Sequence, residues 1–205
     1  DTKMYREYDL IGALNGKSDY SRICIEFIMV ARLLWSKGVA EYVEAARRIG
    51  IIYPKVKFNL LGFLEDKNPN AVDELTLKSW ISEGFINYLG STDDVRPYVL
   101  NSDCVVLPSY YMEGTPKSLL EAAAMAKPII TTDWVGCRNV VDEGINGFLC
   151  KPKDVDDLEM KMREMIELGF DKRYEMGKNS RAKAEQKFDE NLVISAYIEK
   201  LNELA

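Results

Sequence analysis

Histidine is absent from this sequence of 205 residues. A site built from this chain alone therefore has no imidazole base, no Ser-His-Asp triad and no histidine metal ligand. The four cysteines, Cys24, Cys104, Cys137 and Cys150, are scattered without the C-x-x-C spacing of zinc or redox motifs. Three of them lie in apolar runs. We therefore expect buried free thiols in a reducing compartment, and neither a disulfide framework nor a zinc site.

Long apolar runs are missing as well. No stretch approaches the ~18 residues of a membrane-spanning helix, and no signal peptide opens the sequence. These features predict a cytoplasmic protein, working in its full-length form at the inner face of the membrane or free of it. The first residue is Asp1 and not methionine, so we expect a piece of a longer protein.

Basic residues are outnumbered by acidic ones. The chain has 27 Lys and Arg against 33 Asp and Glu, a formal net charge of −6. This balance argues against a general binder of nucleic acid or anionic membranes, because such proteins depend on a basic surface. Hydrophobic residues make up 47% and charged residues 29%, as in globular proteins with a proper core. The length favours one large domain.

Short β-rich runs alternate with longer helical patterns. Near-continuous apolar runs such as Cys104–Leu107 indicate strands of a parallel sheet covered by helices on both faces. We therefore predict an α/β fold, a three-layer doubly wound Rossmann-like domain with a mainly parallel sheet, which binds ligands at the carboxyl ends of its strands. The expected strands are 23–31, 56–62, 86–90, 104–108, 128–132 and 147–150, and the expected helices are 38–50, 71–84, 95–102, 116–126, 154–168, 172–187 and 190–204.

The turn after the fourth expected strand carries the richest chemistry. Thr115 is predicted as the N-cap of the next helix and Pro116 as its first residue. The backbone amides of Lys117 and Ser118 would then be unpaired and face the crevice. Helix dipole and lysine charge suit a phosphate, and Gly114 lets the backbone approach a ligand closely. An ordinary capped helix is the alternative.

Glu121 is a single carboxylate in a helix whose neighbouring residues are apolar on every side. An ionised carboxylate buried without partners is costly, and the hydroxyls of a bound sugar or ribose would satisfy it. Glu113 lies eight positions earlier, so both carboxylates can face one ligand whose phosphates rest on the amides between them. This arrangement suits a nucleotide-sugar. A structural salt bridge is the alternative for Glu121.

Two cations follow the first expected strand. Arg32 comes directly after it and Lys37 precedes the next helix, five positions on. At the carboxyl edge of a sheet, such a pair can clamp a diphosphate, with bidentate contacts from the arginine and a point charge from the lysine. Solvated surface charge is the alternative.

Three segments in order carry a resemblance to a known family. They are Ala-Arg-Leu-Leu-Trp-Ser-Lys-Gly at 31–38, the spacing Glu113-x7-Glu121, and Gly-Cys-Arg-Asn-Val-Val-Asp-Glu-Gly-Ile-Asn-Gly-Phe-Leu at 136–149. Together they resemble the nucleotide-sugar-binding half of group 1 retaining glycosyltransferases of the GT-B fold. The resemblance is greatest to bacterial enzymes of polysaccharide and glycan-lipid assembly, such as PglA-type N-acetylgalactosaminyltransferases. Asn139 departs from the pattern, since many relatives carry glutamate there.

The resemblance implies a role for each candidate residue. Glu113 would be the catalytic residue that contacts the donor sugar, and Glu121 would bind the ribose. The base would lie against Gly90, Ser91 and Thr92. The donor diphosphate would be bound by Arg32, Lys37, Gly114, Thr115, Pro116, Lys117 and Ser118.

The same resemblance implies the partners. The donor would be a UDP-sugar, and the acceptor a glycan or an undecaprenyl-diphosphate-linked sugar bound mainly by an N-terminal domain that this chain does not contain. Family enzymes retain the sugar's configuration and require no metal or other cofactor. The string Asp154-Val-Asp156 opens a helix, so we interpret it as a cap and not as a metal site.

The expected division of the chain has three parts. Residues 1–22 read as an interdomain linker, 23–187 as the donor-nucleotide-binding domain, and 188–205 as a C-terminal helix that packs toward the N-terminal domain. Packing of that helix against its own sheet is the alternative.

Two other functions stay open. They are a non-catalytic nucleotide-binding module on the same fold and a sugar-nucleotide epimerase. A glycan phosphorylase is disfavoured because no motif for a phosphopyridoxal-binding lysine is present. Since transfer needs a closed cleft, we expect this chain alone to bind nucleotide weakly and to transfer little.

Overall fold

The structure, a computed structural model, describes residues 25–65, 67–112 and 114–204. The predicted linker 1–22, Cys24 and the candidate catalytic residue Glu113 lie outside these described residues. The remaining cysteines, Cys104, Cys137 and Cys150, are buried free thiols, as predicted.

Six parallel strands form one sheet in the order β3-β2-β1-β4-β5-β6. The first strand, β1, lies in the middle of the sheet; β2 and β3 follow toward one side, and β4, β5 and β6 follow on the other side of β1. Crevices for ligands form at such a reversal, outside the carboxyl ends of the strands. The strands are β1 (Glu26–Val30), β2 (Lys57–Leu61), β3 (Asn87–Tyr88), β4 (Cys104–Leu107), β5 (Ile129–Thr132) and β6 (Gly147–Cys150).

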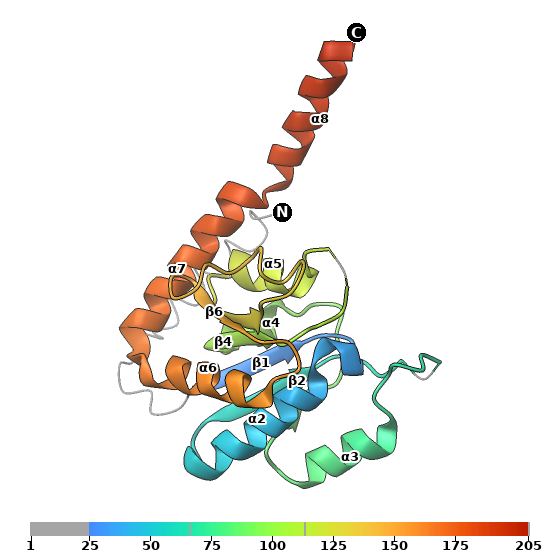
Figure 1. Cartoon of the computed structure of the whole chain (residues 1–205), viewed down its shortest axis with the longest axis vertical. Coiled ribbons are helices and arrows are strands. Elements are labelled where there is room, and N and C mark those ends of the chain that lie inside the picture. The colour runs from blue at the N-terminus through green and yellow to red at the C-terminus, as the bar shows by residue number, and fades with distance from the viewer. Residues whose placement is uncertain (1–24, 66, 113, 205) are drawn as a thin grey trace.

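Helices cover both faces of the sheet, which confirms the three-layer α/β prediction (Figure 1). On one face α2 packs along α6, and on the other α5 packs along α7. The helices are η1 (Trp35–Lys37), α2 (Val39–Ile52), α3 (Glu74–Ser82), α4 (Arg96–Asn101), α5 (Lys117–Ala124), α6 (Val155–Glu167), α7 (Gly169–Lys187) and α8 (Glu190–Leu204).

Strands β4 and β5 are fully buried, as their apolar runs predicted. Every residue of β4 and of β5 is buried. The two threonines of β5 place hydroxyls in this core and satisfy them locally: Thr131 donates to the carbonyl of Leu107 at 2.7 Å, and Thr132 donates to the carbonyl of Ser109. Because buried hydroxyls need such partners, these bonds tie β5 to the segment after β4.

Every expected helix and strand is present, with small differences at the ends. The short helix η1 was not predicted. The predicted cap of α5 is wrong: the helix begins at Lys117, and its N-cap is Pro116 with an extended ψ of 129° and no side-chain cap hydrogen bond. The backbone of Pro116 is itself extended and not helical, so the first helical position moves by one residue, from Pro116 to Lys117.

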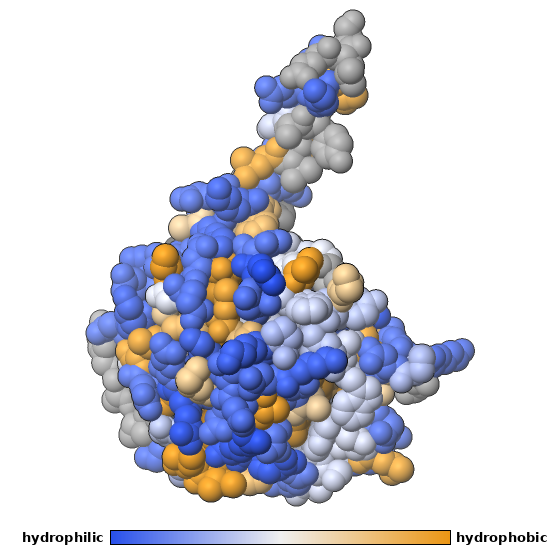
Figure 2. All heavy atoms as spheres, in the orientation of Figure 1, coloured by the Kyte–Doolittle hydropathy of each residue, from blue (hydrophilic) through white to orange (hydrophobic). Residues whose placement is uncertain are grey.

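The last helix, α8, extends away from the sheet (Figure 1). It exposes Leu192, Ile194, Ile198 and Leu201, whose side chains are about half or more accessible. The alternative in which α8 packs on its own sheet is therefore wrong for these four residues, and packing toward another domain stays a proposal. Elsewhere the face shown in Figure 2 is mostly polar. Within the described ranges, no helix has the length and apolar character needed to cross a membrane.

Candidate functional site

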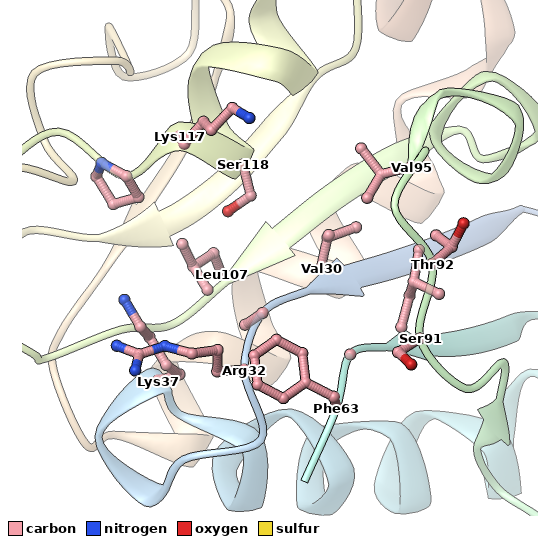
Figure 3. Close-up of a pocket in the computed structure, with 14 residues that line it drawn as sticks. Val30, Arg32, Lys37, Phe63, Ser91, Thr92, Val95, Leu107, Lys117 and Ser118 are labelled. Carbon is pink, nitrogen blue, oxygen red and sulfur yellow. The ribbon is translucent and has the colours of Figure 1, made fainter. Parts of the chain in front are cut away.

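A pocket of about 300 Å³ opens at the carboxyl edge of the sheet, where β1 and β4 lie side by side. Five segments form its walls: the end of β1 with the loop after it, the end of β2, the loop after β3, the end of β4, and the start of α5. Figure 3 shows Arg32 and Lys37 toward one end of the pocket and Ser91 and Thr92 toward the other, with Phe63 between them. The strand order brings these distant segments together.

Lys37 is buried, with only 7% of the residue exposed, so the surface-charge alternative is wrong for this lysine. It ends η1, and the turn continues into α2 through Gly38, whose φ is +78°. A Cβ atom on Gly38 would lie 2.2 Å from the carbonyl oxygen of Pro108, so only glycine allows this approach. The Lys37 ammonium lies 5.1 Å from the ring centroid of Tyr111.

Hydrogen bonds join the loop that carries Lys37 to two other loops. The carbonyl of Ser36 accepts from the amide of Tyr110 at 2.9 Å and from the hydroxyl of Ser109 at 3.4 Å. The hydroxyl of Ser36 accepts from the side-chain amide of Asn70. The loops after β1, β2 and β4 therefore hold one another in place, which fixes the lysine without a bound ligand.

Arg32 also lines the pocket, but 41% of its side chain is exposed. Its guanidinium donates to Glu65 Oε1 at 3.1 Å, an ion pair that the sequence reasoning missed. A hydrogen bond from Asn68 and then the contact with Arg32 hold the pKa of Glu65 below its usual range. Glu65 follows β2 along the chain, and only the pairing of β1 with β2 brings it to Arg32.

The start of α5 forms the wall opposite η1. The carbonyl of Pro116 accepts from the amides of Leu119 and Leu120, at 3.1 and 3.2 Å. The amides of Lys117 and Ser118 occupy the first two helical positions, which have no acceptor within a helix. Ser118 directs its hydroxyl into the pocket, whereas the Lys117 side chain turns away (Figure 3). The helix dipole at this end favours an anion.

Glu121 lies one turn further along α5 and is not part of the pocket lining. Its carboxylate is 14% exposed and lies 3.4 Å from the ammonium of Lys117, which is 88% exposed. The salt bridge considered as the alternative is therefore present. Such pairing with a solvated lysine contributes little to stability, so a ribose-binding role for Glu121 stays a prediction.

The remaining candidate residues divide into two groups. Ser91 and Thr92 line the pocket, whereas Gly90, Gly114 and Thr115 do not. The carbonyl of Gly90 accepts from the amide of Gly62 at 2.8 Å, so Gly90 holds a residue that lines the pocket.

Gly62 and Phe63 were not predicted. A Cβ atom on Gly62 would lie 1.7 Å from the carbonyl oxygen of Ala31, so glycine is required where β1 and β2 end. Phe63 follows it, lines the pocket and is 49% exposed. A glycine directly after an apolar strand was the one available signal for this close approach.

The string Asp154-Val-Asp156 caps a helix, as predicted. The side chain of Asp154 accepts from the amide of Asp157 at 2.9 Å and so begins α6. In the part of the chain that the structure describes, no three His, Cys, Asp or Glu side chains gather in a way that could hold a metal ion.

Comparisons with known proteins point to one family. The family model "Glycosyl transferases group 1" matches residues 25–183. An N,N'-diacetylbacillosaminyl-diphospho-undecaprenol alpha-1,3-N-acetylgalactosaminyltransferase of Campylobacter jejuni is 34% identical over 171 residues, which cover 83% of this chain and 43% of the relative. A putative colanic acid biosynthesis glycosyltransferase, WcaL, of Escherichia coli is 25% identical over 177 residues, 82% of this chain and 43% of the relative. The chain thus spans less than half the length of these relatives.

Solved structures share the fold. HepE of Anabaena, in complex with UDP, superimposes with a TM-score of 0.80 at 22% identity, over 99% of this chain and 55% of that one. Sucrose-phosphate synthase of Thermosynechococcus elongatus gives a TM-score of 0.76 at 21% identity, over 94% of this chain and 48% of that one. Both alignments cover about half of the larger chain, in line with the predicted half of a GT-B architecture.

Proposed function

The chain belongs to the group 1 glycosyltransferases, and from this premise we propose that it forms the donor-binding half of a retaining enzyme. That enzyme transfers a sugar, an N-acetylhexosamine, from a UDP-sugar to a glycan or lipid-linked glycan acceptor. The observation that carries the proposal is the pocket, which is lined both by buried Lys37 and by the start of α5, whose first amides have no acceptor within the helix.

The pocket's electrostatics suit the reaction. When the glycosidic bond to the donor breaks, negative charge develops on the departing nucleoside diphosphate. Lys37 and Arg32 supply positive charge there, and the start of α5 supplies amides and the positive end of its dipole. The loop hydrogen bonds hold these groups in place before the ligand arrives, so little reorganisation is needed when charge develops.

In the proposed complex the donor nucleotide-sugar lies along the length of the pocket. The diphosphate lies between Lys37 and the helix start, and the base lies beside Ser91 and Thr92 at the other end. Glu121 contacts the ribose hydroxyls in place of Lys117. Glu113 contacts the donor sugar, and Gly114 to Pro116 lie against the sugar and the diphosphate.

The donor and acceptor classes rest on relatives. The name of the Campylobacter jejuni relative specifies an N-acetylgalactosaminyl group and a diphospho-undecaprenol acceptor. HepE was solved with UDP, which supports uridine over guanosine in the donor. We propose that a second, N-terminal domain binds most of the acceptor, and that the full protein works in the cytoplasm beside the membrane holding that lipid. Transfer without a metal also stays a proposal.

Titration calorimetry of this chain with UDP, GDP and UDP-N-acetylhexosamines tests the donor site. We expect UDP ligands to bind more tightly than GDP, and Glu121→Ala to weaken them by about tenfold, since two ribose hydroxyls lose a charged acceptor. Glu164→Ala, on α6 and outside the pocket lining, is the matched control and should bind UDP as the parent does. If none of these nucleotides binds, the donor-site assignment for this chain is contradicted.

Chemistry is tested in the full-length protein. Formation of free UDP together with a lengthened acceptor would establish transfer, whereas a changed sugar on intact UDP would establish epimerisation. Glu113→Gln should abolish transfer and leave UDP binding intact. Equal transfer by this variant would exclude Glu113 as the catalytic residue, and nucleotide binding without any turnover would favour a non-catalytic module.

A further inference from the structure

Two consecutive tyrosines after β4 each lie against a lysine from a different part of the chain. The ring of Tyr111 faces Lys37, in the pocket, at 5.1 Å. The ring of Tyr110 faces Lys153 at 4.6 Å, and Lys153 comes from the loop between β6 and α6, outside the pocket lining. Such contacts between an ammonium and an aromatic face are attractive. The loop 109–112 is therefore held by lysines from two sides.

The backbone of Lys153 is in an unfavourable conformation. Its φ is +60°, in the left-handed region, and among the described residues it shares a positive φ with just one other non-glycine, Ala126 at +55°. Glycine adopts this region without the steric penalty that a Cβ atom causes. A lysine is thus present where glycine would suit the backbone better, and strain of this kind tends to persist where the side chain has a function.

Glu41 completes the cluster. It lies in the first turn of α2, and its Oε2 is buried with no hydrogen-bond partner among the residues that the structure describes. Burial raises the pKa of Glu41, and a hydrogen bond from its own backbone amide and then the charge of Lys153 oppose that rise. Burial and then the charge of Glu41 raise the pKa of Tyr110. Lys153 is thus the cation that compensates a desolvated carboxylate and contacts the tyrosine beside it.

The loop 109–112 connects this cluster to the donor pocket. Its Tyr110 amide donates to the carbonyl of Ser36, the residue before Lys37. Along the chain the loop leads to Pro116 and the start of α5, whose amides face the pocket. A displacement of Tyr110 would therefore shift both the lysine and the amides between which the diphosphate is proposed to lie.

We propose that Lys153 is a positioning residue, which holds Tyr110 beside Glu41 and thereby fixes the loop 109–112 that aligns Lys37 and the start of α5 for a nucleoside diphosphate. The inference rests on the proposed donor site, and it adds a residue that does not touch the ligand. It explains why a side chain is present at a position where the backbone favours glycine.

Three substitutions of Lys153 separate charge, side chain and backbone. Lys153→Arg keeps the cation, Lys153→Met keeps length and backbone strain without charge, and Lys153→Gly removes side chain and strain together. UDP affinity is measured by calorimetry, thermal stability by unfolding, and loop order by hydrogen exchange of the amides in 109–112. We expect the arginine variant to behave as the parent. The methionine and glycine variants should bind UDP about three- to tenfold more weakly and exchange faster in 109–112.

The glycine variant gives the sharpest readout. It should melt above the methionine variant, because it loses the same cation but is relieved of the backbone penalty, and yet bind UDP as weakly as that variant does. A residue with a merely structural role would lose stability and affinity together. Ala126→Gly is the matched control for the backbone: it should raise stability and leave UDP affinity and loop exchange unchanged.

A second control removes an equivalent contact elsewhere. Lys178 lies 5.7 Å from the ring of Tyr174 on α7, and Lys178→Met should leave UDP affinity and exchange in 109–112 unchanged. Parental affinity and exchange in Lys153→Met would overturn the proposal, and so would an arginine variant as impaired as the methionine one. If the parent does not bind UDP, the donor-site proposal fails, whereas the exchange comparison still decides whether Lys153 orders the loop.

Discussion

The amino and carboxyl edges of this one sheet differ in how their lysines are used. At the amino edge, Lys57 and Glu26 begin neighbouring strands and form an ion pair at 3.1 Å. Lys127, just before β5, donates to the carbonyls of Leu100 and Ser102, at 2.8 and 2.9 Å, where α4 ends. At the carboxyl edge, Lys37 is buried beside a pocket.

The directions of the helices explain the difference. In a parallel sheet the helices end at the amino edge, where their last carbonyls attract cations from the same chain. They begin at the carboxyl edge, where unpaired amides repel cations and attract anions. Lys57 and Lys127 at the amino edge therefore bind groups of this chain, whereas Lys37 at the carboxyl edge lies beside a helix start that attracts an external anion.

The largest expected loss of stability and UDP binding comes from adding one methyl group at the carboxyl edge of the sheet, at Gly62. Gly62→Ala places a Cβ atom 1.7 Å from the carbonyl oxygen of Ala31, so the ends of β1 and β2 must separate. Denaturant unfolding should show a loss of about 3 kcal/mol, and UDP binding should be lost with it.

Gly50→Ala is the corresponding change near the amino edge. Its Cβ atom meets the ring of Phe85 at 2.9 Å, and a ring can move where a carbonyl cannot. Alanine also favours the helix, so we expect a change within about 1 kcal/mol. Equal losses in the two variants would remove the distinction between the edges.

The next largest effect is expected from removing the charge of one lysine at each edge of the sheet. Lys37→Met should weaken UDP binding by roughly 30- to 100-fold, because a buried cation opposite the diphosphate is lost. Lys57→Met, with its side chain 61% exposed at the amino edge, should leave the affinity unchanged. Calorimetry of both variants decides, and a small effect of Lys37→Met would move the diphosphate away from η1.

A lysine at the amino edge should affect the stability of the protein and not its affinity for UDP. Lys127→Met leaves the carbonyls of Leu100 and Ser102 without their charged donor and should cost about 1.5 kcal/mol of unfolding free energy. UDP affinity should stay at the parental value. If the affinity fell as well, the amino edge would be coupled to the pocket and the two edges would not act independently.

The raised pKa of a buried thiol should be the same property at both edges of the sheet, and two cysteines test this expectation. Cys104 begins β4 at the amino edge and Cys150 ends β6 at the carboxyl edge. Burial raises the pKa of both thiols above the ordinary value of 9.0, that of Cys150 to about 12. The unfolded chain therefore ionises first, so stability is full below pH 9 and falls as the pH rises toward 12.

The effect is measured as a difference between variants. At pH 10, one unit above the ordinary thiol pKa, each buried thiol should lower the unfolding free energy by about 1.4 kcal/mol. Cys104→Ala and Cys150→Ala should each flatten the alkaline part of the stability profile by this amount. Flattening by one of them alone would mean that exposure to solvent differs between the edges.

Much of this molecule could be predicted from local pattern. The alternation of buried strands with amphipathic helices follows from side-chain periodicity, which is a local property. The cations after β1 and the amides at the start of α5 were assigned correctly to strand-to-helix turns. The cap of α5 was misplaced by one residue, because Thr115 is a good cap by type and proline is favoured at the first helical position, whereas the backbone of Pro116 is extended.

Partners across the fold could not be predicted. Glu65 pairs with Arg32 across two neighbouring loops, and Phe63 enters the pocket wall from the end of a strand. Neither residue stands out in the sequence, since a glutamate or phenylalanine in a loop is ordinary. The contact between Lys153 and Tyr110 joins residues 43 positions apart, at a distance where spacing carries no information.

The sequence by itself determined the order of strands and helices, the net charge of −6, the absence of imidazole chemistry and the family of the chain. Only the tertiary structure decided that β4 lies beside β1, which brings the loop with Lys37 to the start of α5 and buries that lysine. The physical reason is that helix and strand formation depends on neighbouring residues, whereas strand order depends on long-range pairing and on the handedness of the crossovers.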